Sequence, residues 1–505
     1  MRKLVYFILV NIIYSGISFC QDFKYEIGNK KVVIGRDLKE NVDIEAVQYT
    51  FPLNVYEFDI DSVRNEVLMV IRKMGELRYR RKGYLINLDL KNENPLWTKK
   101  IRYYYFLSYS DNHIVYPKSN KSYYLDRRSG DMLWFSYSMI KHIDTRRNIG
   151  LFGSLKAADM NTGNVVWERN IDDQFGWDDH LYYNDTTFVI AASGIHTFNL
   201  KDGTGWDHYL RTGKDDYTKT LAMNTVGLGL ALLTGTGYIY TGYDSYHGFA
   251  SNLLMDNDWI YFVSKDNFVC IDIAGELIWE KTYEKNYTSA SEIFFIDENV
   301  IMINKGFAYN NNYMVKRGVS FIAAYNRKNG EQEYFNTIKK NRIIYDYILK
   351  QDTLVILTGD GIFNYSISSG SLIKEISADM SKTGFLKYFP EPDLIYILDK
   401  DSCFRILTRT DITKYYVATD DEKIVVFDES FEDIRKFTQD EIYLRYLSSG
   451  DYNFIARKNK TYILDRNNNV VAELNASGNS VLVGTKLFCV DKKNFNVINL
   501  TGIID

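Results

Sequence analysis

The sequence is poor in proline and cysteine, with 5 Pro and 4 Cys among 505 residues. Proline removes a backbone donor from a sheet ladder, so its scarcity suits a chain of many paired strands. No Cys-x-x-Cys pair is present, which argues against a zinc knuckle or a redox dithiol. Cys270, Cys403 and Cys489 each stand alone in an apolar strand pattern. We expect buried free thiols there, while pairing of two of them in an exported protein remains open.

The sequence also lacks charge of one sign and long apolar runs. Its 61 Lys and Arg are mixed with 65 Asp and Glu, for a net charge of −4. Without a basic stripe, nucleic acid is excluded as an expected partner. No run of 18 apolar residues follows the first twenty residues, so we expect no transmembrane segment in the mature chain. Apolar spacing typical of helices is missing from the same stretch.

The first twenty residues have the pattern of a signal peptide. Arg2 and Lys3 precede the apolar stretch Leu4–Ile17, which is too short to span a bilayer. Ser18 and Cys20 supply the small residues required before a cut after Cys20. The pattern predicts export to the periplasm, the outer surface or the medium. Acylation of Cys20 as a lipoprotein is the alternative.

A short phrase recurs along the remaining chain, in which an apolar strand leads through an Asp- and Gly-containing turn to a second strand with a large aromatic residue. The clearest copies are Ser122–Ile140, Leu155–Ile171 and Phe268–Tyr283. In the second copy, Asp159 and Thr162 can accept backbone N–H groups of a turn, and Gly163 can take a positive φ. Trp167 then lies on the second strand, where we expect it to dock against a neighbouring sheet. The phrase predicts a β-hairpin.

The repeat predicts an all-β fold. Units of roughly 35 to 45 residues with four short strands are typical of propeller blades. We therefore expect residues 21–505 to form a single β-propeller of about seven to eight four-stranded blades. The strands expected within residues 21–75 could close the ring by pairing with the C-terminal strands. The long interval after Trp206 predicts a degenerate unit near Gly237–Gly248, and the interval between Gly275 and Gly330 predicts an insertion.

The repeat resembles that of the PQQ-like (quinoprotein dehydrogenase-like) β-propeller superfamily, whose blades carry an A-x-D-x-x-T-G-x-x-x-W docking motif. The residues that match the motif and that we expect to dock the blades are Asp126, Gly130, Trp134, Asp159, Thr162, Gly163, Trp167, Asp272, Gly275 and Trp279. The resemblance covers roughly Tyr84 to the C-terminus. It implies either a dehydrogenase that holds PQQ and Ca²⁺ or a non-catalytic scaffold. This chain lacks the adjacent cysteine pair of the alcohol-oxidising branch, which favours the scaffold branch and no cofactor.

No residue pattern indicates a catalytic, cofactor-binding or metal-binding site. Four of the 6 His lie between His180 and His247, but their spacing matches no metal motif. The Gly-rich stretch after Asn224 does not fit a nucleotide loop, and no nucleophile elbow is present. Residues proposed for a partner-binding loop surface are His180, His208, Tyr243 and His247.

These observations favour a non-enzymatic binding or assembly scaffold, exported to the cell envelope, with a protein, peptide or glycan as its partner. Propellers bind through loops at the ends of their blades or by strand addition at a blade edge. Two alternatives remain open at this stage. One is a divergent PQQ-dependent oxidoreductase, and the other is a propeller lyase or hydrolase that acts on polysaccharide.

Overall fold

The computed structural model describes residues 28–75, 79–102, 107–118, 121–216, 244–285, 287–310, 313–338, 342–377, 383–389, 395–398, 404–407, 414–419, 423–428, 434–438, 442–457, 460–467, 469–476 and 480–504. Side chains are described at these positions except residues 28, 216, 244 and 457 and the range 378–446. The chain forms two compact units, Met1–Leu133 with Tyr443–Asp505, and Trp134–Ile442. The predicted signal peptide, Cys20, Cys403 and Tyr243 lie outside the described residues.

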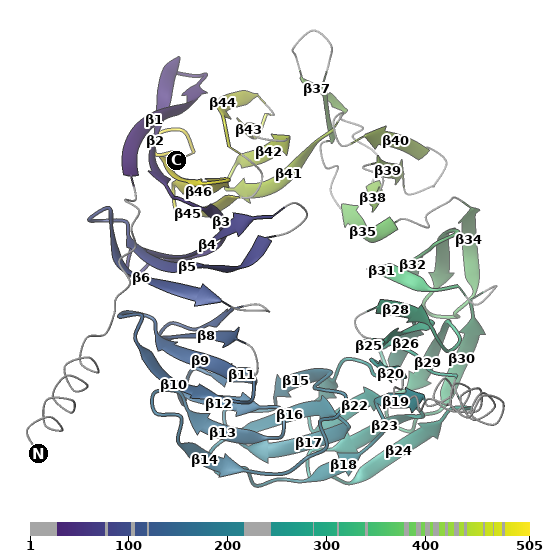
Figure 1. Ribbon diagram of the computed structural model, residues 1–505. Coiled ribbons are helices and arrows are strands. Elements are labelled where there is room, and N and C mark those ends of the chain that lie inside the picture. Colours follow the sequence, from purple (N-terminus) through teal and green to yellow (C-terminus); the bar gives the residue numbers. More distant parts are fainter. Residues whose placement is uncertain are drawn as a thin grey trace, which may run out of the picture. The chain divides into compact units, whose positions relative to one another are not determined.

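The described residues fold into antiparallel sheets without a helix (Figure 1). In the first unit, one four-stranded sheet contains β3 (Asn54–Asp61), β4 (Glu66–Met74), β5 (Tyr79–Asp89) and β6 (Asn94–Arg102). The next contains β7 (Ser108–Tyr109), β8 (His113–Lys118), β9 (Lys121–Asp126) and β10 (Met132–Ser136), and the boundary between the units falls within β10.

Nine further strands of the first unit share one sheet. Their order is β41 (Ile442–Ser449), β42 (Tyr452–Arg457), β43 (Lys460–Leu464), β44 (Val470–Leu474), β1 (Gly28–Asp37), β2 (Val42–Thr50), β47 (Asn494–Asn499), β46 (Lys486–Asp491) and β45 (Ser480–Val483). β2 pairs antiparallel with β47, with Ala46 opposite Ile498 and Thr50 opposite Asn494. The N-terminal strands are thus built into the same sheet as the last strands of the chain.

The second unit begins with three sheets of four consecutive strands. They are β11 (Ile140–Asp144), β12 (Ile149–Phe152), β13 (Lys156–Asp159) and β14 (Val165–Glu168); β15 (Asp179–Tyr182), β16 (Thr187–Ala192), β17 (Gly194–Asn199) and β18 (Asp207–Tyr209); and β21 (Leu254–Asp256), β22 (Trp259–Val263), β23 (Asn267–Asp272) and β24 (Leu277–Thr282).

Three more four-stranded sheets complete this series. They are β25 (Ser291–Ile296), β26 (Asn299–Asn304), β29 (Phe321–Asn326) and β30 (Gln332–Thr337); β31 (Ile344–Lys350), β32 (Thr353–Thr358), β33 (Gly361–Ser366) and β34 (Leu372–Ser377); and β35 (Thr383–Phe389), β38 (Lys414–Thr419), β39 (Lys423–Asp428) and β40 (Ile434–Thr438). β36 (Ile395–Leu398) and β37 (Phe404–Leu407) form an antiparallel hairpin.

A ninth four-stranded sheet has a different origin. It joins β19 (Gly213–Asp216) and β20 (Asp244–His247) to the hairpin of β27 (Phe307–Asn310) and β28 (Tyr313–Lys316). That hairpin interrupts another sheet, because β26 pairs directly with β29. The insertion predicted between Gly275 and Gly330 is therefore confirmed. We call these four strands the inserted sheet.

The degenerate blade predicted near Gly237–Gly248 is not what the structure shows for the described part of that segment. β20 belongs to the inserted sheet, where it pairs with β19 and β27. Trp206 lies instead over Gly275 in the β21–β24 sheet, the next blade-like sheet along the chain. The long interval between aromatic residues arises because the chain leaves the blade series, so spacing alone counted one unit too many.

Where side chains are described, the middle strands of the four-stranded sheets hold much of the core. In β16 and β22, the residues from Phe188 to Ala192 and from Ile260 to Val263 are fully buried. They face neighbouring sheets on both sides, which explains why these strands are continuously apolar rather than alternating. The fold is therefore all-β and of the β-propeller class, as predicted. The described residues form nine four-stranded sheets, eight of them besides the inserted sheet, against the seven to eight blades expected.

Candidate binding cleft

Each repeated turn is organised by its aspartate and glycine. Asp159 Oδ1 accepts N–H groups from Asn161 and Thr162 at 3.1 and 2.8 Å, and the Thr162 hydroxyl donates to the same oxygen. Asp126 and Asp272 accept backbone N–H groups of their own turns in the same way. The glycine φ angles are 71° at Gly130, 73° at Gly163 and 99° at Gly275, and a side chain would be strained there.

The aromatic residue after each turn packs on the turn of the following sheet. The Trp134 ring covers Gly163, Trp167 covers Gly203 and Trp279 covers Gly330. Their indole N–H groups donate to the carbonyl oxygens of Met160, Leu200 and Arg327 at 2.7, 2.8 and 2.9 Å, respectively. Within the second unit, the β11–β14 and β21–β24 sheets are thereby each fixed to the next sheet by a buried ring and one hydrogen bond.

Three further aromatic residues make the same contact, and the motif match above did not include them. They are Trp97 over Gly130, Trp206 over Gly275 and Tyr334 over Gly370. Their N–H or O–H groups donate to the carbonyl oxygens of Arg127, Ile273 and Ile367. Their position after an Asp- or Asn-containing turn is the feature of the sequence that could have predicted this contact. Tyr334 does not match the motif, because the motif specifies tryptophan at that position.

The histidines proposed as a loop surface do not form one cluster. His180 lies on β15 and His208 on β18, at opposite edges of one sheet. His247 lies in the inserted sheet, where its ring stacks on Tyr309 with centroids 5.7 Å apart. The chain spacing of these residues could not reveal this, because it says nothing about which sheet each strand joins.

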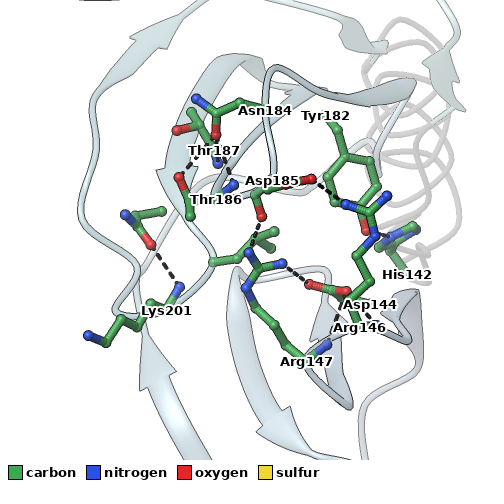
Figure 2. A network of polar contacts seen from close by, with 12 residues as sticks. His142, Asp144, Arg146, Arg147, Tyr182, Asn184, Asp185, Thr186, Thr187 and Lys201 are labelled. Atoms are coloured by element: carbon green, nitrogen blue, oxygen red, sulfur yellow. Dashed lines mark hydrogen bonds and ion pairs between the residues drawn. The ribbon is translucent and has the colours of Figure 1, made fainter.

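His180 belongs to an aromatic cluster between the β11–β14 and β15–β18 sheets. Its ring centroid lies 4.8 Å from that of His142, which in turn lies 4.9 Å from the Phe188 ring. His142 Nε2 is 2.8 Å from the Tyr182 hydroxyl. Figure 2 shows how the neighbouring turns are tied together, with Arg147 bonded to both Asp144 and the carbonyl of Asp185. These contacts join the two sheets.

The fold should lose stability in acid because of His142. Burial, reinforced by His180, lowers the pKa of His142 from 6.5 to about 4. The unfolded chain therefore binds this proton at higher pH, and stability falls as the pH drops from about 6.5 towards 4. After allowance for partial exposure, we expect a loss of about 1–2 kcal/mol. Urea unfolding at several pH values checks this. In His142→Phe that part of the pH dependence should disappear, and an unchanged acid slope would contradict the assignment.

A more open site lies between the β15–β18 and β21–β24 sheets. It is a cleft of about 570 Å³, and we call it the polar cleft. Its lining residues are Asp172, Phe175, Ser193, Tyr209, Leu210, Arg211, Ser264, Asp266, Asn267, Glu280 and Thr282. Strand alternation places Glu280 and Thr282 on the face of β24 opposite Trp279, which packs on the following sheet. One face of β24 therefore carries Trp279, which packs on the next sheet, and the opposite face lines the polar cleft.

The acidic residues of the polar cleft differ in their partners. Asp266 is neutralised by two cations, Arg211 Nη2 at 2.7 Å and Lys265 Nζ at 3.1 Å. Asp172 and Glu280 form no ion pair with any residue that the structure describes. The cleft therefore carries excess negative charge. A second pocket holds Asp256, Asp258 and Glu298 with Arg327 and Lys328. There Asp256 and Glu298 pair with the two cations, and Asp258 accepts a hydrogen bond from the Tyr183 hydroxyl.

Two groups near the polar cleft are buried without a complete set of partners. The Ser193 hydroxyl, in a residue only 6% exposed, has no hydrogen-bond partner within the described part of the chain. Behind it in the same sheet, His196 Nδ1 lies 2.8 Å from Asp207, while its buried Nε2 has no partner among these residues either. An unmet hydroxyl in the wall of a cleft costs stability, and a bound polar ligand can satisfy it.

Histidine protonation is disfavoured next to the cleft. Burial lowers the pKa of His208, although the nearby Glu280 carboxylate opposes that shift. Burial likewise lowers the pKa of His196 against the pull of Asp207. Near neutral pH both rings are therefore uncharged, and they do not offset the carboxylates. The lining combines carboxylates, hydroxyls, an amide and two aromatic rings, a composition suited to binding.

The described residues contain neither a metal-binding cluster nor a membrane-spanning helix. No group of three or more His, Cys, Asp or Glu side chains is placed to hold a metal ion. No helix there is long and apolar enough to cross a bilayer. Cys270 and Cys489 are buried free thiols, as predicted, and burial raises the pKa of Cys489 to about 11.

Comparison with known proteins gives distant structural likenesses. No family model matches the sequence, and no curated protein is similar to it. Among solved structures, BamB from Moraxella catarrhalis matches with a TM-score of 0.34 at 12% identity, over 79% of this chain and 99% of that one. Dihydro-heme d1 dehydrogenase NirN matches with 0.36 at 11%, over 77% and 78%. The Cps50 (Swd1) β-propeller domain of Myceliophteria thermophila matches with 0.27 at 8%, over 76% and 97%.

Proposed function

We propose that this protein is an exported, non-enzymatic binding scaffold of the cell envelope, built from PQQ-like propeller repeats, and that it holds a protein, peptide or glycan partner in the polar cleft. The observation that carries the proposal is the cleft itself, in which the buried Ser193 hydroxyl and the Asp172 and Glu280 carboxylates have no partners among the residues that the structure describes. These groups can hold a ligand by hydrogen bonds and charge.

Rigidity of the cleft walls supports a binding role. Trp206 fixes the β15–β18 sheet to the β21–β24 sheet through its contact with Gly275 and its bond to the Ile273 carbonyl at 2.8 Å. The two walls therefore meet the ligand without prior rearrangement, which lowers the entropy cost of binding. The signal-peptide pattern supports export, and mass spectrometry of the exported protein should find Gln21 as its first residue.

The proposal is tested by screening the purified protein against a displayed peptide library and a glycan array, beside a variant in which Glu280→Gln and Tyr209→Ala alter the cleft. We expect binders that the variant loses while its melting temperature stays close to that of the wild type. Absence of binders in both screens, or equal retention by the variant, would remove the cleft as the site. Alcohol oxidation with added PQQ and Ca²⁺ would refute the non-enzymatic role.

A further inference from the structure

We infer that the polar cleft takes the cationic side chain of an arginine or lysine in an extended peptide segment. This inference rests on the proposed binding function and specifies its ligand. The first support is charge. Asp172 and Glu280 lack ionic partners within the described part of the chain, whereas Asp266 is already neutralised by Arg211 and Lys265. A neutral ligand would leave the Asp172 and Glu280 carboxylates unpaired, whereas a cationic ligand would compensate their charge.

The second support is the kind of apolar surface beside those charges. Phe175, Tyr209 and Leu210 line the same cleft, and Tyr209 is 58% exposed. Arginine and lysine have apolar stems that pack on such surfaces, and their charged ends are attracted to the face of an aromatic ring. Together with the carboxylates, these residues match both parts of a long basic side chain.

The third support is an unmet hydrogen-bonding group. The Ser193 hydroxyl is buried in the cleft wall and has no partner among the described residues. It can accept a hydrogen bond from a guanidinium or ammonium group, which donates only. The acidic side chains are thus accompanied by an independent polar group that a bound ligand can pair.

An extended peptide fits the walls of the cleft better than an isolated cation does. β18 and β24, which contribute Tyr209 and Glu280, are each the terminal strand of their sheet. A terminal strand presents backbone N–H and C=O groups along its outer edge, where an extended chain can pair. The volume of about 570 Å³ also exceeds that of a single side chain, leaving space for flanking residues.

The test compares three small probes with the full mature protein by isothermal titration. Acetyl-Gly-Arg-Gly-amide and its lysine counterpart carry the charge, and acetyl-Gly-citrulline-Gly-amide is a neutral isostere of the arginine probe. We expect both cationic peptides to bind more tightly than the citrulline peptide by about fivefold or more, with weaker binding at higher ionic strength. Glu280→Gln and Asp172→Asn should each weaken arginine-peptide binding by about three- to fivefold.

Glu276→Gln is the matched control, because Glu276 is exposed and immediately precedes the other end of the same strand, β24. It should leave arginine-peptide binding unchanged. Ser193→Ala should weaken that binding with no loss of melting temperature, since the hydroxyl it removes bonds to none of the described residues. Equal binding of the arginine and citrulline peptides, or equal effects of Glu280→Gln and Glu276→Gln, would overturn the inference.

A neutral disaccharide, cellobiose or chitobiose, is titrated in parallel. Saccharide binding that Glu280→Gln abolishes, without binding of the cationic peptides, would overturn the inference while leaving the scaffold function intact. Failure of the peptide-library and glycan screens described above would instead refute the proposed function. The two failures are thus distinguishable.

Discussion

Replacement of Trp167 by alanine is expected to lower the free energy of unfolding of the second unit by about 3–5 kcal/mol. The Trp167 side chain is 7% exposed and packs edge-on against Phe198 at a centroid distance of 5.4 Å. Its loss leaves a cavity over Gly203 and deprives the Leu200 carbonyl of its indole donor. Urea unfolding followed by circular dichroism measures the change.

Val166→Ala is the control for this experiment. Val166 is the preceding residue of the same strand but is 49% exposed, so we expect a loss of about 0.5 kcal/mol or less. Trp167→Phe should fall between the two, because it keeps a ring and loses the hydrogen bond. If Trp167→Ala lowers the free energy of unfolding by less than about 1 kcal/mol, the packing of Trp167 on the next sheet contributes little to stability.

Gly203, the residue that the Trp167 ring covers, allows a second measurement of the same contact. A methyl group on Gly203 would lie 2.6 Å from the Trp167 ring, and the φ of 75° already disfavours a side chain. Gly203→Ala should therefore be strongly destabilising alone. In the double variant with Trp167→Ala the steric part of its cost disappears, so the two losses should sum to more than the measured loss. Strict additivity would show that the ring and the glycine do not act as a unit.

The repeated hairpins were predictable because each is specified locally. Asp159, Thr162 and Gly163 need only their own turn to adopt this geometry, and the aromatic residue follows at a fixed offset. The inserted sheet was not predictable, because β20 and β27 are far apart in sequence and carry no shared motif. The spacing of the aromatic residues therefore predicted a degenerate blade, whereas β20 leaves the blade series and pairs with β27 of the inserted hairpin.

The polar cleft was beyond sequence reasoning for a related reason. Its lining comes from the ends of two sheets, and Asp172, Ser193 and Glu280 belong to no common motif. Which carboxylates stay unpaired depends on the position of Arg211 and Lys265 beside Asp266, a tertiary detail. Of the predicted loop residues, His208 comes nearest to the site, since the Glu280 charge acts on its pKa.

Removal of the N-terminal strands β1 and β2 should abolish cooperative folding of the first unit. Ile34, Ile44, Ala46 and Tyr49 on these strands are each 5% exposed or less. Deletion of residues 21–51 removes this apolar surface and exposes the edge of β47, which otherwise pairs with β2 over five residues. Calorimetry should show that the transition of this unit is lost, together with aggregation through the open edge.

Failure to fold could have other origins, so the decisive test is complementation. A synthetic peptide of residues 28–51, added during refolding of the truncated protein, should restore the missing transition because it supplies the same strand pairs. A peptide in which Tyr49→Ala and Ala46→Asp disrupt the buried face of β2 should not restore it. In contrast, Val33→Ala should have no effect on restoration, since Val33 is 58% exposed. A truncated protein that melts like the full chain would show that the N-terminal strands are dispensable, and that the pairing of β2 with β47 is a consequence of folding rather than a requirement for it.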